Sequence, residues 1–367
     1  FHLLLAHCVM RGTMQNMTNP HNIYIHTPFC MSKCNYCAFF SRACSAPDWA
    51  AFADGILHEI EFWGQRMGRI SVPTVFFGGG TPSLMPTKIF GQIMNALRTN
   101  FDLMPDAEIT LESNPKTLDK TRLCEFVNFG VNRLSVGVQR LNDETLQFLG
   151  RTHSVHDALE LLDTAHKCEL RLNADFIYGL PCDTPDSVMQ MCKDINTLGL
   201  HHVSMYELTI EPNTPFGHMN LEMPSNDAMA DMYTIIGENL SIPRYEVSNY
   251  ATAGDECRHN QNIWDGAPYI GIGRGAAGRP YIQNLWYEQT GGDIQMRPLS
   301  TDARATEKII TGMRTMRGVN KTNDVMKIIN TEYVRTHPEL ISDTGNRICA
   351  TKKGILILDD LLVNLCN

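Results

Sequence analysis

The stretch that decides the fold is residues 22–40, NIYIHTPFCMSKCNYCAFF. A short apolar, β-prone run, Ile23-Tyr24-Ile25, leads through Pro28 into a loop. The loop holds three cysteines, Cys30, Cys34 and Cys37, in the spacing Cys-x3-Cys-x2-Cys. Three thiolates this close on one loop can converge on one centre, and thiolate is the ligand that suits iron–sulfur clusters and zinc.

The sequence around the cysteines favours a cluster over zinc. A structural zinc site takes four protein ligands, and the nearest fourth candidates, His26 and Cys44, do not complete a usual zinc spacing. A [4Fe–4S] cluster held by three thiolates leaves one iron open for a small molecule. We therefore predict a [4Fe–4S] cluster, with a zinc site or three buried structural thiols as the alternatives.

The same stretch resembles a known family. The three-cysteine spacing with an aromatic residue, Tyr36, before the last cysteine is similar to the signature of the radical S-adenosylmethionine (SAM) superfamily. The preceding residues 24–29, YIHTPF, resemble the group that contains oxygen-independent coproporphyrinogen III oxidase, a dehydrogenase, and the haem chaperones called HemW. Phe39 stands where the dehydrogenase carries a fourth cysteine, so the chain resembles the haem chaperone branch. The resemblance implies that SAM chelates the open iron.

Size and composition set the class of protein. The chain has 367 residues, of which 43% are hydrophobic and 19% charged, as expected for an ordinary folded protein. A net charge of −9 without a basic run argues against a nucleic-acid partner. Twelve cysteines in so long a chain indicate a reducing compartment with one metal site rather than a disulfide scaffold. No apolar run reaches the roughly 20 residues that span a bilayer. We predict a cytoplasmic protein with a flexible leader at residues 1–20.

The rest of the chain predicts an α/β fold. Six apolar strands, separated by helices, are expected at residues 23–25, 75–77, 109–112, 133–139, 172–178 and 202–209. Strict alternation implies parallel strands, either as an open barrel or as a doubly wound sheet. The family resemblance selects a partial (β/α)6 barrel over residues 21–220. Residues 221–367 lose the alternation and predict a smaller α+β domain, with a strand at 244–249, helices at 303–317, 321–336 and 358–365, and a small wing.

Polar and glycine residues follow the predicted strands where chemistry gathers in parallel α/β folds. They are the glycines at 78–80 with Thr81, then Glu112, Gln139 and Asp175. The simpler interpretations are a tight turn for the glycines, a solvated strand end for Glu112, and an Arg151–Asp175 ion pair that closes the barrel. The resemblance implies instead that a set of residues binds one or two SAM molecules: Tyr24, Tyr36, Gly79, Gly80, Thr81, Glu112, Gln139, Arg151 and Asp175.

A second motif points to haem. Residues 256–264, ECRHNQNIW, resemble the chaperones' haem motif His-Asn-x-x-Tyr-Trp, with Ile263 in place of the tyrosine. Imidazole is a common ligand of haem iron. The motif makes His259 the predicted haem ligand, whereas a lone loop histidine is more often a hydrogen-bonding residue. Three arginines are candidates to meet the haem propionates: Arg258, Arg274 and Arg279. A departure from the family pattern is Ala277, where relatives usually carry histidine.

Together these features predict a haem chaperone rather than an enzyme. It would bind a [4Fe–4S] cluster, SAM and haem, and pass haem to acceptor proteins, respiratory ones among them. The alternative is a coproporphyrinogen III dehydrogenase that decarboxylates two propionates.

Overall fold

A central sheet organises the protein, for which a computed structural model describes residues 19–290 and 294–366. Its strands lie side by side in the order β10 (Tyr269–Ile272), β1 (Asn22–Thr27), β4 (Ser71–Gly79), β5 (Asp102–Ser113), β6 (Arg133–Gln139), β7 (Arg171–Tyr178), β8 (His202–Glu207) and β9 (Asn249–Ala251). The run from β1 through β8 is parallel and contains the six predicted strands, so the partial (β/α)6 barrel is confirmed.

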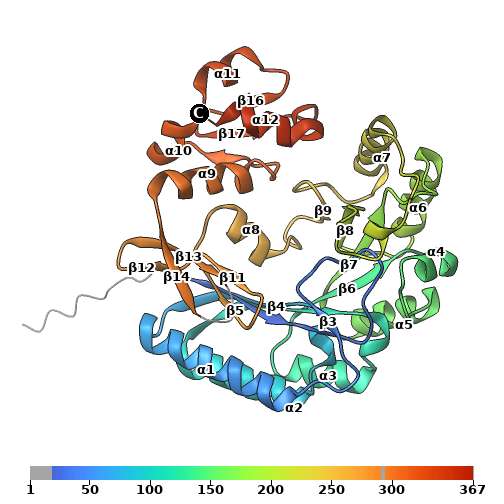
Figure 1. Cartoon of the computed structure of the whole chain (residues 1–367), viewed down its shortest axis with the longest axis vertical. Helices are drawn as coiled ribbons and strands as arrows, with labels where there is room; N and C mark the ends of the chain where they lie inside the picture. Colours follow the sequence, from blue (N-terminus) through green and yellow to red (C-terminus); the bar gives the residue numbers. More distant parts are fainter. Residues whose placement is uncertain (1–18, 291–293, 367) are drawn as a thin grey trace, which may run out of the picture.

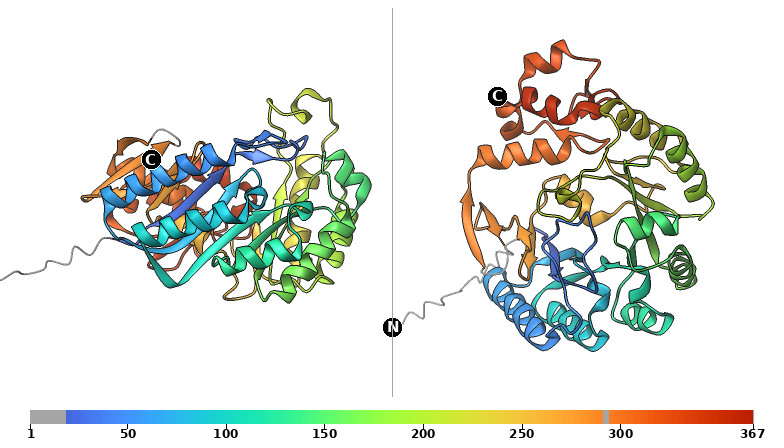
Figure 2. Two further views of the ribbon diagram at one scale, coloured as in Figure 1. Left: turned by 90° about the horizontal axis from the view of Figure 1, so that it is seen from below. Right: turned by 45° about the vertical axis from the view of Figure 1, so that its right-hand side comes forward.

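Helices cover the outer face of this curved sheet (Figures 1 and 2). In chain order they are α1 (Trp49–Met67), α2 (Thr87–Asn100), α3 (Lys120–Asn128), α4 (Asp143–Phe148), α5 (Val155–Lys167), α6 (Pro185–Asn196) and α7 (Asn226–Asn239). Several begin at a residue whose side chain accepts a hydrogen bond from the first turn, such as Asp48, Ser154 and Thr184. These caps fix where each helix leaves its loop.

Alternation along β6 separates an apolar outer face from a polar inner face. On β6, Leu134, Val136 and Val138 are fully buried in the core beneath the helices. The residues between them line the barrel interior: Arg133, Ser135, Gly137 and Gln139. The inner face of β6 is therefore polar.

The edges of the sheet come from beyond residue 220, the predicted domain boundary. β9 pairs antiparallel with β8, and β10 pairs parallel with β1. Between them α8 (Arg258–Trp264) contacts β1 and β4 (Figure 1). The sheet thus draws on residues from both sides of that boundary, and the division into two domains stays a prediction.

The prediction of a strand at residues 244–249 is wrong over most of that range. The ladder forms at β9 and includes only Asn249 of that stretch, with Arg244 paired to Tyr250 in an isolated bridge. The cause is Glu246, whose carboxylate accepts from the Ser248 amide at 2.8 Å and from Asn249 Nδ2 at 2.5 Å. These bonds close a turn where a strand was expected.

Two smaller sheets accompany the barrel. A ribbon follows β10 and consists of β11 (Ala277–Gly278), β12 (Tyr281–Ile282), β13 (Leu285–Thr290) and β14 (Gln295–Leu299). A wing consists of β15 (Val319–Asn320), β16 (Ile341–Asp343) and β17 (Arg347–Ala350). The wing packs with α9 (Thr301–Gly312), α10 (Asn323–Ile328), α11 (Thr331–Thr336) and α12 (Leu358–Leu365) around a second core.

The helix predicted at residues 321–336 is two helices. Ile329 is extended, and the Asn330 side chain accepts from the Tyr333 amide at 3.0 Å, which starts α11 afresh. Residues 1–18 of the predicted leader lie outside the described residues. Within the described ranges, none of the helices has the length and apolar character to span a membrane.

Candidate functional site

The cysteine loop is held at its ends and in its middle. At its ends β2 (Phe29–Cys30) pairs in parallel with β3 (Arg42–Ala43). In its middle the Asn35 amide donates to the Leu149 carbonyl at 3.0 Å, and Asn35 Nδ2 donates to the Phe148 carbonyl at 2.8 Å. The loop is therefore fixed against the barrel rim beside β6 and α4.

The three cysteines of this loop line one cavity of about 420 Å³. Cys30, Cys34 and Cys37 are half-buried free thiols. Within residues 19–290 and 294–366, no three His, Cys, Asp or Glu side chains are placed to hold one metal ion. A cluster does not require its ligands to converge on one point, because each of its thiolates binds a different iron. The three free thiols that line one cavity supply the donor set of a [4Fe–4S] cluster with one open iron.

His26, a possible fourth zinc ligand, has both ring nitrogens engaged. Its Nε2 lies 2.8 Å from the Phe40 carbonyl, which can only accept, so Nε2 donates. Its Nδ1 then accepts from the Tyr24 hydroxyl at 3.0 Å. Burial lowers the pKa of His26 and keeps it neutral. This histidine supports the strand next to the loop.

The glycines after β4 let the backbone approach the cysteine loop. Gly79 has a φ of +112°, and its amide donates to Glu112 Oε2 at 3.1 Å. A Cβ on Gly80 would lie 2.6 Å from the Phe29 carbonyl oxygen and 3.0 Å from Cys30 Sγ. Glycine is required here by close contact, and both glycines line the cavity.

Two carboxyl groups, Glu112 and Asp175, also line the cavity. Burial, and then the neighbouring Asp175, raise the pKa of Glu112 to about 8. Burial also raises the pKa of Asp175, although Asn173 Nδ2 and Ser135 Oγ donate to it at 2.8 and 3.1 Å. Both groups thus favour a ligand that brings positive charge or hydrogen-bond donors.

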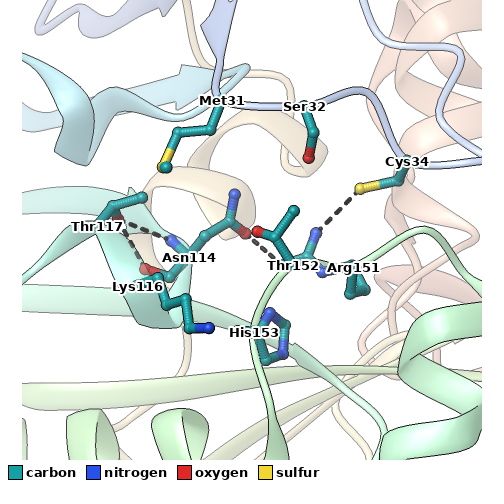
Figure 3. A pocket seen from close by; sticks show the side chains of 9 residues that line it. All are labelled: Met31, Ser32, Cys34, Asn114, Lys116, Thr117, Arg151, Thr152 and His153. Carbon is teal, nitrogen blue, oxygen red and sulfur yellow. Dashed lines mark hydrogen bonds between the residues drawn. The ribbon is translucent and has the colours of Figure 1, made fainter. Parts of the chain in front are cut away.

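Arg151 connects the cavity wall to the cysteine loop (Figure 3). Its Nη1 donates to Cys34 Sγ at 3.3 Å, while Nη2 donates to the Gly137 carbonyl at 2.9 Å and to Asn114 Oδ1. Asn114 Nδ2 in turn donates to Thr81 Oγ1 at 3.0 Å. In the described chain Arg151 forms no ion pair with Asp175, so the predicted barrel-closing pair is not seen.

A side cavity of about 20 Å³ lies behind this contact (Figure 3). Its lining residues are Met31, Ser32, Cys34, Asn114, Lys116, Thr117, Arg151, Thr152 and His153. Burial, with Arg151 second, lowers the pKa of His153 to about 4. The space suits about one water molecule and no larger ligand.

Gln139 and Tyr36 both reach the cavity wall. Gln139 has a φ of +67° where the register between β6 and β7 shifts. This bulge re-aims the last side chain of β6. Tyr36 packs against the small core around Phe216, and burial raises its pKa.

Three predicted site residues lie outside the set that lines the cavity: Tyr24, Thr81 and His259. Tyr24 hydrogen-bonds to His26, and Thr81 accepts a hydrogen bond from Asn114, so both support neighbouring residues without lining the cavity. His259 is 2% exposed and its Nδ1 lies 2.7 Å from Thr74 Oγ1. Burial lowers its pKa to about 4. The structure therefore does not bring His259 to an open surface.

The arginines predicted for haem propionates lie apart from one another. Arg279 is paired with Glu307 at 2.8 Å and Arg258 with Asp106 at 3.3 Å. Arg274 is exposed, with its guanidinium 5.9 Å from the centre of the Phe40 ring. Only Arg274 lies beside the cysteine loop.

Sequence reasoning missed the polar residues on the inner wall. They are Asn114, Arg133, Ser135, Asn173, Ser204, Asn249 and Asn260. Period-two alternation of polar and apolar residues along β6 and β7 is the signal that could have found three of them, Arg133, Ser135 and Asn173. Asn249 comes from the sheet edge beyond residue 220 and gives no local signal, whereas Asn260 belongs to the His-Asn-x-x-Tyr-Trp motif, which does not reveal that it lines the cavity.

Comparison with known proteins agrees with this geometry. The Radical SAM superfamily profile matches residues 24–195. The haem chaperone HemW of Escherichia coli (strain K12) is 37% identical over 266 residues, which cover 71% of this chain and 70% of that protein. The mitochondrial radical S-adenosyl methionine domain-containing protein 1 of Bos taurus is 34% identical over 308 residues, or 81% of this chain and 69% of that protein.

A solved structure supports the fold. Coproporphyrinogen III oxidase (HemN) from Escherichia coli superposes with a TM-score of 0.79, covering 96% of this chain and 91% of that one. At 20% sequence identity this likeness establishes the fold alone. From the sequence relatives and the shared fold, the chain belongs to the radical SAM superfamily and, within it, to the family of the haem chaperone HemW.

Proposed function

We propose that this protein is a haem chaperone, which binds a [4Fe–4S] cluster, SAM and haem and delivers haem to acceptor proteins. The observation that supports it most is its identity of 32–37% to haem chaperones named HemW over some 70% or more of the chain. Respiratory haem proteins as acceptors and a cytoplasmic location remain parts of the proposal.

The chain's own residues have distinct roles in cofactor binding. Cys30, Cys34 and Cys37 would hold the cluster, which when bound supplies an open iron for SAM and an electron for its cleavage. Arg151 offsets the charge of the Cys34 thiolate. The backbone at Gly79 and Gly80 gives SAM close access to the loop. Five further residues surround or support the SAM site in this proposal: Tyr24, Thr81, Glu112, Gln139 and Asp175.

We keep His259 as the proposed haem ligand, through Nε2 only, because Nδ1 is committed to Thr74. The side chain is buried, so haem would have to approach from the barrel interior, where the neighbouring Asn260 lines the cavity. An open surface site at His259 is not part of the proposal.

The competing function is coproporphyrinogen III dehydrogenase, which the fold likeness alone would allow. Phe39 argues against it. This side chain occupies the position of the dehydrogenase's fourth cysteine, lines the cavity and is 70% exposed. We therefore propose a radical SAM fold that does not decarboxylate porphyrinogens.

The test is a haem titration of the anaerobically reconstituted protein, followed by the Soret band. His259→Ala is compared with Thr74→Val. The second variant removes the hydrogen-bond partner of the His259 imidazole but leaves the imidazole in place. Binding lost only in His259→Ala supports ligation by His259. Equal losses in both variants mean that the pair supports packing and that another residue ligates iron. No binding by wild type, with product formed from coproporphyrinogen III, would overturn the chaperone proposal.

A further inference from the structure

Arg133 lies on the inner wall of the barrel. It begins β6, and every second residue after it, Ser135, Gly137 and Gln139, also lines the cavity. Because side chains on one strand face alternate sides, the same parity directs the Arg133 side chain inward. The residue is only 2% exposed. A guanidinium is therefore enclosed within the barrel.

This guanidinium has no direct protein partner in the part of the chain that the structure describes, neither a hydrogen bond nor an ion pair. Its neighbour in the parallel register, Arg171, differs: Nη1 donates to Glu108 at 2.7 Å and Nη2 to the Glu256 carbonyl at 2.8 Å. Glu108 and Asp175 act on Arg133 only through their charge. Nearby acidic groups compensate the charge, but buried N–H groups without an acceptor are costly, which points to an acceptor that is supplied from outside the chain.

Arg133 lies at the opposite end of β6 from the cysteine loop. Gln139 lies at the end of β6 near the cysteine loop, and Arg133 is six residues earlier, about 20 Å away along an extended strand. Around Arg133 the cavity wall carries the neutral side chains Asn173, Ser204 and Asn249, and also the carboxyl groups of Glu112 and Asp175. None of these groups hydrogen-bonds to the guanidinium, whose planar N–H groups match the two oxygens of one carboxylate.

We propose that Arg133 binds a carboxylate of the ligand at the floor of the barrel, and that this carboxylate is a propionate of the tetrapyrrole. The second half of this statement rests on the proposed haem chaperone function. Haem carries its two propionates on one edge, so the ligand enters with that edge toward β6. Arg133 thus acts as a specificity residue for the acidic edge of the porphyrin.

The experiment compares haem with haem dimethyl ester, which lacks the two negative charges, on the full chain after anaerobic reconstitution and with SAM present. Wild type should bind haem about 10- to 100-fold more tightly than the ester, the range expected for a charge-assisted hydrogen bond. Arg133→Met should bind haem as weakly as the ester, with ester affinity unchanged. Arg171→Met is the matched control, because it removes an arginine of the same layer that is already paired. It should keep the preference for haem.

Each outcome decides the proposal. If Arg133→Met does not fold, Arg133→Lys keeps the charge and loses the planar fork, and it must show a smaller preference for haem than wild type. An unchanged preference in either Arg133 variant overturns the role of Arg133 and leaves the chaperone function standing. Equal binding of haem and its dimethyl ester by wild type also overturns the role of Arg133 and leaves the chaperone function standing. A wild type that binds neither ligand overturns the proposed function together with this inference.

Discussion

Arg151 donates a hydrogen bond from Nη1 to the Sγ atom of Cys34 at 3.3 Å. The two residues are 117 positions apart, and the contact joins the cysteine loop to the segment after α4. The guanidinium is fixed by Gly137 and Asn114 on its other side, so it is preorganised to stabilise a thiolate at Cys34. We therefore propose that Arg151 tunes the cluster in addition to its proposed place in the SAM site.

Replacing Arg151 with methionine should lower the reduction potential of the reconstituted cluster. The loss should be about 30–60 mV, because a charge-assisted hydrogen bond contributes about 1.5–3 kcal/mol and part of that differs between the two oxidation states. The check is a redox titration followed by electron paramagnetic resonance. Arg151→Lys, which keeps the charge, should recover part of the shift, and equal potentials in all three proteins would contradict the assigned contact.

Gly80→Ala should prevent the cysteine loop from closing over the cluster. Its Cβ would lie 2.6 Å from a backbone oxygen, that of Phe29, which cannot move away cheaply. We expect most of the roughly 400 nm absorbance and iron content after reconstitution to be lost. Gly55→Ala is the control, since Gly55 is exposed on α1 with open space around it, and this change should stabilise by about 0.5–1 kcal/mol. A Gly80→Ala protein with full iron content would show that the loop tolerates the methyl group.

The sequence predicted what local patterns encode and missed what distant contacts decide. The six strands follow from short apolar runs, and Glu112 and Gln139 could be placed because strand ends meet at one rim. Asp175 lies inside β7 instead, and it reaches the cavity because side chains alternate along the strand. The burial of His259 could not be predicted, because it depends on its amide bonding to Glu108, 151 residues away. For Arg133, the alternation along β6 could have indicated a polar face, but it does not say that this face lines a cavity.

The C-terminal core should depend on α12. Leu361 is fully buried there, whereas Val363 on the same helix is 78% exposed. Leu361→Ala should lower the free energy of unfolding by about 2–5 kcal/mol, through lost burial and the cavity left behind. Val363→Ala should stay within about 0.5 kcal/mol. Chemical denaturation of both variants gives the comparison, and similar values for the two would contradict the assigned packing.

Glu112 should make the stability of the cofactor-free protein depend on pH. Burial and Asp175 raise its pKa to about 8 in the folded state, against about 4.5 when unfolded. Between these values the folded state holds more protons than the unfolded state, so the contribution of Glu112 is full below about pH 4.5 and is lost as pH rises to about 8. The slope is at most about 1.4 kcal/mol per pH unit, less where water in the cavity screens the charge. Glu112→Gln cannot titrate at this position. The unfolding free energy of wild type minus that of the variant should therefore fall as pH rises through this window, and parallel stability curves would show that Glu112 is already ionised when the cavity holds only water.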